Sequence, residues 1–249
     1  MTDLAGRVAV ITGASRGIGR AIAEAYAAHG AHVCCAARSV ADLDAVVRGI
    51  ADAGGSADAI ELDVTDESSV GEAFATISGR GRGLDIAVLN AGVAPPASRV
   101  ETSDLADWRT TFDVNLFGVV SCAIHAAPLL REGGGGKIIV VGSGTGHQTN
   151  KGLGAYAASK AAVASTVRTL ALELRRDRIA VNELVPGPVA TAMTVDPADG
   201  DDASQPIVAR GTDEWMKQPE DVTDLALFLA RQPNDGPSGQ VFSLMGRLM

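Results

Sequence analysis

The chain has 249 residues, of which 46% are hydrophobic and 20% are charged. This composition is typical of a globular protein with a sizeable core and excludes a disordered or fibrous chain. The formal net charge of −9 has the wrong sign for binding nucleic acid or an anionic membrane. Three cysteines cannot build a disulfide framework, so we expect a reducing, cytoplasmic environment, and no group of side chains suggests a metal site.

No segment suggests targeting or membrane insertion. The first apolar run, Val8–Ile11, is too short for a signal peptide and follows an acidic residue where such a peptide carries bases. The longest uncharged run, Val114–Leu130, contains an asparagine, a histidine and a proline and falls short of the roughly 20 apolar residues that span a bilayer. We predict that this run forms a helix buried on most sides.

Apolar runs alternate with stretches of helical periodicity along most of the chain. The predicted strands are Val8–Thr12, Val33–Ala37, Ala57–Leu62, Ile86–Asn90, Lys137–Gly142, Ile179–Val185 and Val241–Leu244. The predicted helices are Gly17–His29, Val40–Ala53, Glu67–Ile77, Val114–Leu130, Tyr156–Arg175 and Pro219–Ala230. One irregular stretch, residues 191–217, is rich in Asp, Pro, Gly and Ser and is a candidate lid.

This alternation predicts the fold class. Strands that are apolar throughout suit a sheet covered on both faces, and alternating strands and helices imply right-handed crossovers between parallel strands. We therefore predict an α/β protein: a single doubly wound parallel-sheet Rossmann domain over residues 1–249, with about seven strands and helices on both faces.

A glycine-rich loop, Thr12-Gly13-Ala14-Ser15-Arg16-Gly17-Ile18-Gly19, joins the first predicted strand to the first helix. Glycine allows backbone angles closed to other residues and lets the backbone approach a bound phosphate, which the amides of the helix start then hold. The alternative is a glycine-rich turn without a ligand. The position after an apolar strand favours a dinucleotide site.

Tyr156 and Lys160 are four residues apart, so on a helix they share one face. The ordinary pKa of tyrosine, about 10, is too high for efficient proton exchange at neutral pH, and a neighbouring ammonium favours the phenolate. Ser143, at the end of a predicted strand, can hydrogen-bond a substrate oxygen. The alternative is a surface Tyr and Lys that share a face by chance.

Together these motifs resemble the short-chain dehydrogenase/reductase family, and within it the 3-oxoacyl-acyl carrier protein reductase-like branch. Leu89-Asn90-Ala91-Gly92 resembles the family's Asn-Asn-Ala-Gly, with Leu in the first place. Tyr156-Ala-Ala-Ser-Lys160 matches Tyr-x-x-x-Lys, and Ser143 lies thirteen residues before the tyrosine, as in the family. Asn115 matches the family's helix asparagine, and Asn182-Glu-Leu-Val-Pro186-Gly187 its Asn-x-x-x-Pro-Gly.

The resemblance implies a role for each catalytic candidate. Tyr156 is the acid/base, Lys160 binds the nicotinamide ribose and lowers the tyrosine pKa, and Ser143 orients the carbonyl. Asn115 holds a water in the proton relay; the alternative, a helix-interior Asn that satisfies nearby backbone groups, is compatible with the same role. The hydride comes from the cofactor, because no side chain supplies one.

The second predicted strand ends without the acidic residue that hydrogen-bonds the ribose 2′-hydroxyl of NAD. Ala37 stands in that position and is followed by Arg38, while Arg16 in the glycine loop supplies a second cation. Two guanidiniums suit a 2′-phosphate, so we predict NADP(H), with NAD(H) and solvated arginines as the alternative. The predicted cofactor-binding residues are Gly13, Ser15, Arg16, Gly17, Ile18, Gly19, Arg38, Asp63, Val64, Asn90, Ala91, Gly92, Tyr156, Lys160, Pro186, Gly187, Val189 and Thr191.

The expected reaction is reversible hydride transfer between the nicotinamide and a small ketone or secondary alcohol, in the direction of carbonyl reduction. We expect the substrate pocket to be lined by Gly144, Thr145, His147, Val93–Pro96, Pro188 and the lid, with His147 either a polar handle or incidental. An NAD(P)-binding regulator without turnover, an NAD-dependent alcohol dehydrogenase, a Rossmann methyltransferase and an enoyl reductase are the alternatives. The wider Tyr–Lys spacing of the enoyl reductases disfavours the last.

Two further expectations concern partners. The predicted helices Val114–Leu130 and Tyr156–Leu174 carry more apolar surface than one sheet contact requires, and by resemblance they form the dimer core of a homotetramer, with a homodimer as the alternative. The acidic net charge does not favour docking of an acidic acyl carrier protein. The basic cluster Arg175, Arg176 and Arg178 leaves that alternative open.

Overall fold

The computed structural model describes residues 3–148, 150–193 and 215–246. Within these ranges, seven parallel strands form one sheet in the order β3-β2-β1-β4-β5-β6-β7. The strands are β1 (Val8–Thr12), β2 (His32–Ala37), β3 (Ser56–Glu61), β4 (Ile86–Leu89), β5 (Gly136–Val141), β6 (Ile179–Val185) and β7 (Val241–Ser243). The strand order reverses between β1 and β4, the switch point of a doubly wound sheet. The predicted α/β parallel-sheet fold is confirmed.

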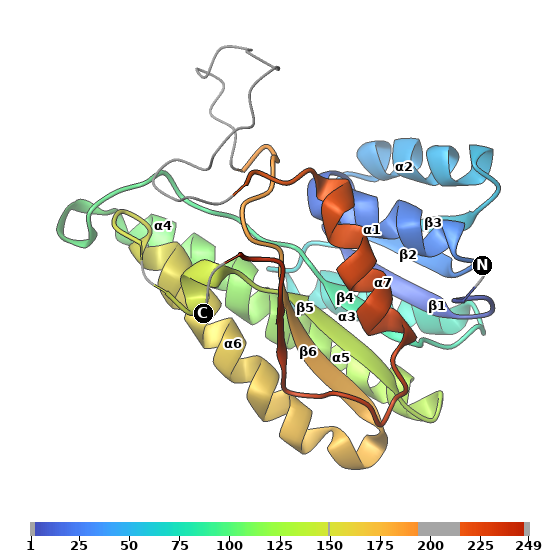
Figure 1. The fold of residues 1–249 in the computed structure, drawn as a ribbon. Coiled ribbons are helices and arrows are strands. Elements are labelled where there is room, and N and C mark those ends of the chain that lie inside the picture. The colour runs from blue at the N-terminus through green and yellow to red at the C-terminus, as the bar shows by residue number, and fades with distance from the viewer. Residues whose placement is uncertain (1–2, 149, 194–214, 247–249) are drawn as a thin grey trace.

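Helices cover both faces of the sheet (Figure 1). One layer consists of α1 (Gly17–Ala28), α2 (Val40–Asp52) and α7 (Thr223–Arg231). The other consists of α3 (Glu67–Gly79), α5 (Gly118–Glu132) and α6 (Gly154–Glu173), with α4 (Leu105–Phe112) packed on α6. Helices that lie on the sheet place apolar side chains against it, as Ile22 and Tyr26 do from α1 and Val70 and Phe74 do from α3.

Side chains fix where several of these helices begin. Ser39 accepts a hydrogen bond from the Asp42 N–H at the start of α2, at 3.3 Å. Asp66 and Asp104 accept from N–H groups in the first turns of α3 and α4, at 2.9 and 2.8 Å. These caps satisfy backbone donors that have no partner within the helix.

The sequence analysis did not predict α4, but it did predict the helix that follows. Thr111 is the buried residue of α4, so this helix has no apolar stripe for the periodicity to reveal. The run Val114–Leu130 forms a π-helical turn (Asp113–Phe117) followed by α5. The run is buried on most sides, as expected, and it exposes a stripe that includes Phe117 and Ile124, which are 59% and 62% exposed.

By length and composition, one continuous helical run among the described residues could cross a membrane. It spans Leu105–Glu132 and contains an 18-residue window of mean hydropathy 1.5, of which 44% is buried. Val119, Cys122 and Leu130 of α5 lie in the core that this layer shares with the sheet. The candidate lid, residues 191–217, lies largely outside the described residues, which omit 194–214.

Replacing Tyr26 with Phe tests how the α1–α7 layer is held. The Tyr26 hydroxyl is fully buried and donates to the Ala226 carbonyl of α7 at 2.8 Å. We expect the free energy of unfolding to fall by about 1 kcal/mol, the usual net worth of such a bond. Urea denaturation measures it. Tyr26→Leu should cost more, because it also leaves a cavity. A Phe variant as stable as the wild type would show that this hydrogen bond does not stabilise the layer.

Candidate active site

A cleft of about 950 Å³ lies at the carboxyl ends of the central strands. The cleft crosses the switch point between β1 and β4, where open α/β sheets bind ligands. All the residues predicted to bind a cofactor line this cleft except Gly19. Of the four predicted catalytic residues, Ser143, Tyr156 and Lys160 line it and Asn115 does not.

The glycine loop is held against the end of β4. Gly13 and Gly17 have positive φ angles of 67° and 55°, which glycine adopts at little cost. Asn90 donates from Nδ2 to the Thr12 carbonyl at 2.9 Å, so the loop is tied to the neighbouring strand. A Cβ on Gly19 would overlap the Gly13 carbonyl and the Asn90 side chain. Gly19 therefore permits close packing beneath the loop and does not face the cleft.

The start of α1 has free backbone donors. In the part of the chain that the structure describes, no side chain caps α1, in contrast to α2, α3 and α4, and its first turn holds no acid. Gly17 and Ile18 of that turn line the cleft. Unpaired amides at the positive end of a helix bind phosphate groups. This arrangement fits a dinucleotide pyrophosphate.

Three charged residues that follow β2 and β3, Arg38, Asp42 and Asp63, also line the cleft. Arg38 and Asp63 were both predicted from the sequence. The N–H of Thr65 lowers the pKa of Asp63, and its hydroxyl and the charge of Arg38 act in the same direction against burial. Asp42 of α2 also lines the cleft, and the sequence reading missed it. An acid in the first turn after the second strand was the signal that could have found it.

Helix α6 presents Tyr156 and Lys160 to the cleft from one face. The Lys160 Nζ lies 5.9 Å from the centre of the Tyr156 ring and donates to the Val141 carbonyl at 2.9 Å. Burial lowers the pKa of Lys160 to about 8. Burial also raises the pKa of Tyr156, while a hydrogen bond from Ser143 acts in the opposite direction. The pKa of Tyr156 is thus raised by desolvation, whereas the sequence led us to expect that the ammonium would lower it.

Asn115 is buried in the π-helical turn and serves the scaffold. Its Oδ1 accepts from the Val93 N–H at 2.8 Å, and its Nδ2 donates to the Val93 carbonyl at 2.9 Å and to the Ser159 hydroxyl at 3.0 Å. These bonds tie the loop after β4 to α6, which carries Tyr156 and Lys160. The helix-interior alternative thus describes the side chain, which lies behind the cleft.

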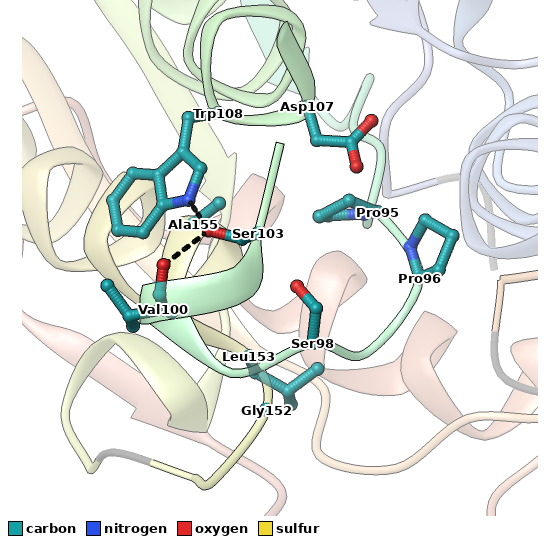
Figure 2. Close-up of a pocket in the computed structure, with 11 residues that line it drawn as sticks. Pro95, Pro96, Ser98, Val100, Ser103, Asp107, Trp108, Gly152, Leu153 and Ala155 are labelled. Carbon is teal, nitrogen blue, oxygen red and sulfur yellow. Dashed lines mark hydrogen bonds between the residues drawn. The ribbon is translucent and has the colours of Figure 1, made fainter. Parts of the chain in front are cut away.

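The expected substrate-pocket residues separate in the structure. Val93 and Ala94 line the cleft, whereas Gly144, Thr145, His147, Pro95, Pro96 and Pro188 do not. Pro95 and Pro96 border a separate recess beside α4, where the Trp108 indole N–H donates to the Ser103 hydroxyl at 2.8 Å (Figure 2). This recess has a free volume of about 10 Å³. That is about the space of one water molecule, so it cannot hold a substrate.

His147 is bound to a buried acid that the sequence reading missed. Its Nε2 lies 3.0 Å from Oε2 of Glu183, which is 0% exposed in the middle of β6. The signal was present, because Glu183 is an acid within an otherwise largely apolar strand covered on both faces. His147 is therefore neither a polar handle in the cleft nor incidental.

Comparisons with known proteins agree with this geometry. A family model described as enoyl-(acyl carrier protein) reductase matches residues 13–246. An NADPH-dependent aldehyde reductase-like protein of Arabidopsis thaliana is 36% identical over 98% of this chain and 94% of its own. A 3-oxoacyl-[acyl-carrier-protein] reductase of Synechocystis is 35% identical over 100% of this chain and 99% of its own.

A solved structure carries the same fold. The short-chain type dehydrogenase/reductase from Mycobacterium marinum superposes with a TM-score of 0.88 at 35% identity, over 98% of this chain and 96% of its own. The family model, the relatives and the solved structure thus match nearly the whole length of this chain. The chain belongs to the short-chain dehydrogenase/reductase family and is an oxidoreductase.

Proposed function

We propose that this oxidoreductase uses NADP(H) and reduces a small ketone to a secondary alcohol by reversible hydride transfer. The observation that carries the proposal is the convergence of Ser143, Tyr156 and Lys160 on the cleft that also contains the free amides of α1. A regulator that binds a dinucleotide without turnover has no need of these three side chains at one end of the cleft.

Each catalytic side chain has a part in this chemistry. NADPH supplies the hydride when bound, held by the glycine loop and by Lys160. The Ser143 hydroxyl orients the carbonyl oxygen, and the Tyr156 phenol donates the proton that this oxygen takes up. Because burial raises the pKa of Tyr156, the phenol is protonated at neutral pH, the form that reduction requires.

Two positive side chains support NADP(H). Arg16 and Arg38 are exposed and line the same cleft, and Ala37 leaves space where an acid would repel a 2′-phosphate. The relative in Arabidopsis thaliana is named NADPH-dependent. The competing proposal, an NAD-dependent alcohol dehydrogenase, draws support from Asp42, which adds a negative charge beside Arg38.

Substrates carried by an acyl carrier protein gain no support from the basic cluster. Arg175, Arg176 and Arg178 precede the first residue of β6, whereas the cleft lies past its last residue. Seven strand residues separate the two ends by roughly 20 Å. Enoyl reduction, named in the family model's description, is disfavoured by the four-residue spacing of Tyr156 and Lys160. We therefore propose a free small-molecule ketone.

A cytoplasmic location is part of the proposal. Cys34, Cys35 and Cys122 are buried free thiols in the described structure, and burial raises the pKa of each. Such thiols are unreactive and suit a reducing compartment.

Replacing Tyr156 with Phe tests the proton donor. We expect ketone reduction to fall by roughly 10²–10⁴-fold while the affinity for NADPH stays nearly unchanged, because most cofactor contacts lie elsewhere. Initial rates at saturating NADPH and NADPH fluorescence titration measure the two effects. Tyr26→Phe, which removes the chain's other tyrosine hydroxyl from the core, is the matched control and should keep the wild-type rate. More than a tenth of the wild-type rate in Tyr156→Phe would overturn the assignment.

Cofactor preference is tested by Ala37→Asp combined with Arg38→Gln. A charged hydrogen bond is worth roughly 1.5–3 kcal/mol, so the preference for NADPH should fall by about ten- to a hundredfold. The measurement is kcat/KM with each cofactor. Arg20→Gln removes an equal charge from an arginine that pairs with Glu24 outside the cleft and should change nothing. Equal or better wild-type kcat/KM with NADH would contradict the proposal.

Assembly is tested by disrupting an apolar surface. Phe117 and Ile124 from the region of α5, and Leu172 from α6, are 59, 62 and 76% exposed in the isolated chain. Exposed apolar groups of this kind mark an interface, so we propose a homotetramer built on these helices. Sedimentation should show an oligomer at micromolar concentration and its dissociation in Ile124→Glu. A wild-type monomer would refute it.

A further inference from the structure

Glu183 points from the sheet toward the helix that carries the catalytic pair. Alternate residues of β6 face opposite sides, and Val181, two residues earlier, lies in the core beneath α5 and α6. Glu183 therefore faces α6. Its neighbours in the sheet are Val140 of β5 and Val241 of β7, so no polar group flanks it along the sheet.

The carboxylate has a built environment. Oε2 is hydrogen-bonded to His147 Nε2 at 3.0 Å, and the backbone N–H of Ser143 opposes the rise of the carboxyl pKa that burial causes. A Cβ on Gly142 would overlap Oε1, so the glycine at this place makes room for the acid. Within the described residues, Oε1 is the buried side-chain oxygen without a hydrogen-bond partner. A buried, half-satisfied carboxylate is costly unless a charge compensates it.

Lys160 is the opposite charge in the same region. It is 5% exposed, and its ammonium donates a hydrogen bond to a neutral carbonyl, that of Val141. Glu183 raises the pKa of Lys160 against burial, and burial raises the pKa of Glu183, which His147 and Lys160 oppose. The titratable groups that face Glu183 are thus Lys160 from α6 and His147 after β5, while β7 presents none among its described residues.

We propose that Glu183 is a positioning residue for the reaction: it is the buried counter-charge that keeps Lys160 an ammonium, and His147 holds its carboxylate in place. The inference rests on the proposed function for the role of Lys160. Glu183 and His147 do not line the cleft, so they act on the reaction through Lys160.

The chain offers a direct test, because it has four lysines: Lys137, Lys151, Lys160 and Lys217. Lysine labelled with ¹³C at Cε gives one NMR signal for each, and Lys160→Arg assigns its signal by loss. Titration between about pH 5 and 11 follows the chemical shift of each signal and gives the pH midpoint at which each ammonium loses its proton. In Glu183→Gln, which keeps the shape and removes the charge, the Lys160 midpoint should fall by about one pH unit or more.

Two controls accompany this titration. Lys137 is also buried, with a pKa lowered to about 8 by burial, but lies at the amino end of β5, so its midpoint should not move. Glu61→Gln removes a charge from the exposed end of β3 and should leave Lys160 unchanged. An unchanged Lys160 midpoint in folded Glu183→Gln overturns the proposal.

If Glu183→Gln does not fold, the same titration of the wild-type protein tests the proposal. Two groups that interact strongly titrate as a coupled pair. The Lys160 signal should then show a second inflection at a pH below its own midpoint, where Glu183 takes up its proton. A single-step curve overturns the proposal.

Kinetics separate this inference from the proposed function. With NADPH and a ketone that the wild type reduces, Glu183→Gln should move the alkaline limb of kcat/KM to lower pH by the same amount as the Lys160 midpoint. A purely structural defect would lower the rate equally at every pH. A wild type that reduces no ketone in a broad panel defeats the proposed function alone, because the NMR titration needs no turnover. An unmoved alkaline limb and an unmoved midpoint defeat the role of Glu183 alone.

Discussion

The parallel register of β1, β4, β5 and β6 is the constraint on which the rest of the structure depends. Parallel neighbours end at the same edge of the sheet, so the loops that follow them meet there. Gly13, Asn90 and Ser143 come from three such loops and line one cleft although they are far apart in sequence. Helix α6, packed against β6, then adds Tyr156 and Lys160 at the same edge.

Polar groups buried beneath this edge keep it rigid. Asn90 joins the glycine loop to β4, and Asn115 joins the following loop to α6 through both ends of its amide. A buried amide that satisfies all its donors favours one arrangement of the segments it connects, because any other leaves polar atoms without partners. These hydrogen bonds therefore hold the segments that carry the catalytic side chains from behind.

Burial also sets the chemistry at the end of the cleft. Desolvation raises the pKa of Tyr156 and lowers that of Lys160, so both shift toward their neutral forms. A protonated phenol suits proton donation, but a neutral amine would not serve as the cation beside it. The carboxylate of Glu183 opposes that loss, which explains why a strand in the core carries an acid.

The sequence by itself determined the order of strands and helices, the glycine loop and the Tyr156–Lys160 pair, because periodicity and spacing are local properties. It did not determine α4, which has no apolar stripe, or the π-helical turn before α5. Only the tertiary structure decided that Asn115 lies behind the cleft and that His147 turns to Glu183. Those partners are separated by tens of residues, and contacts between distant segments arise from packing, which no local pattern encodes.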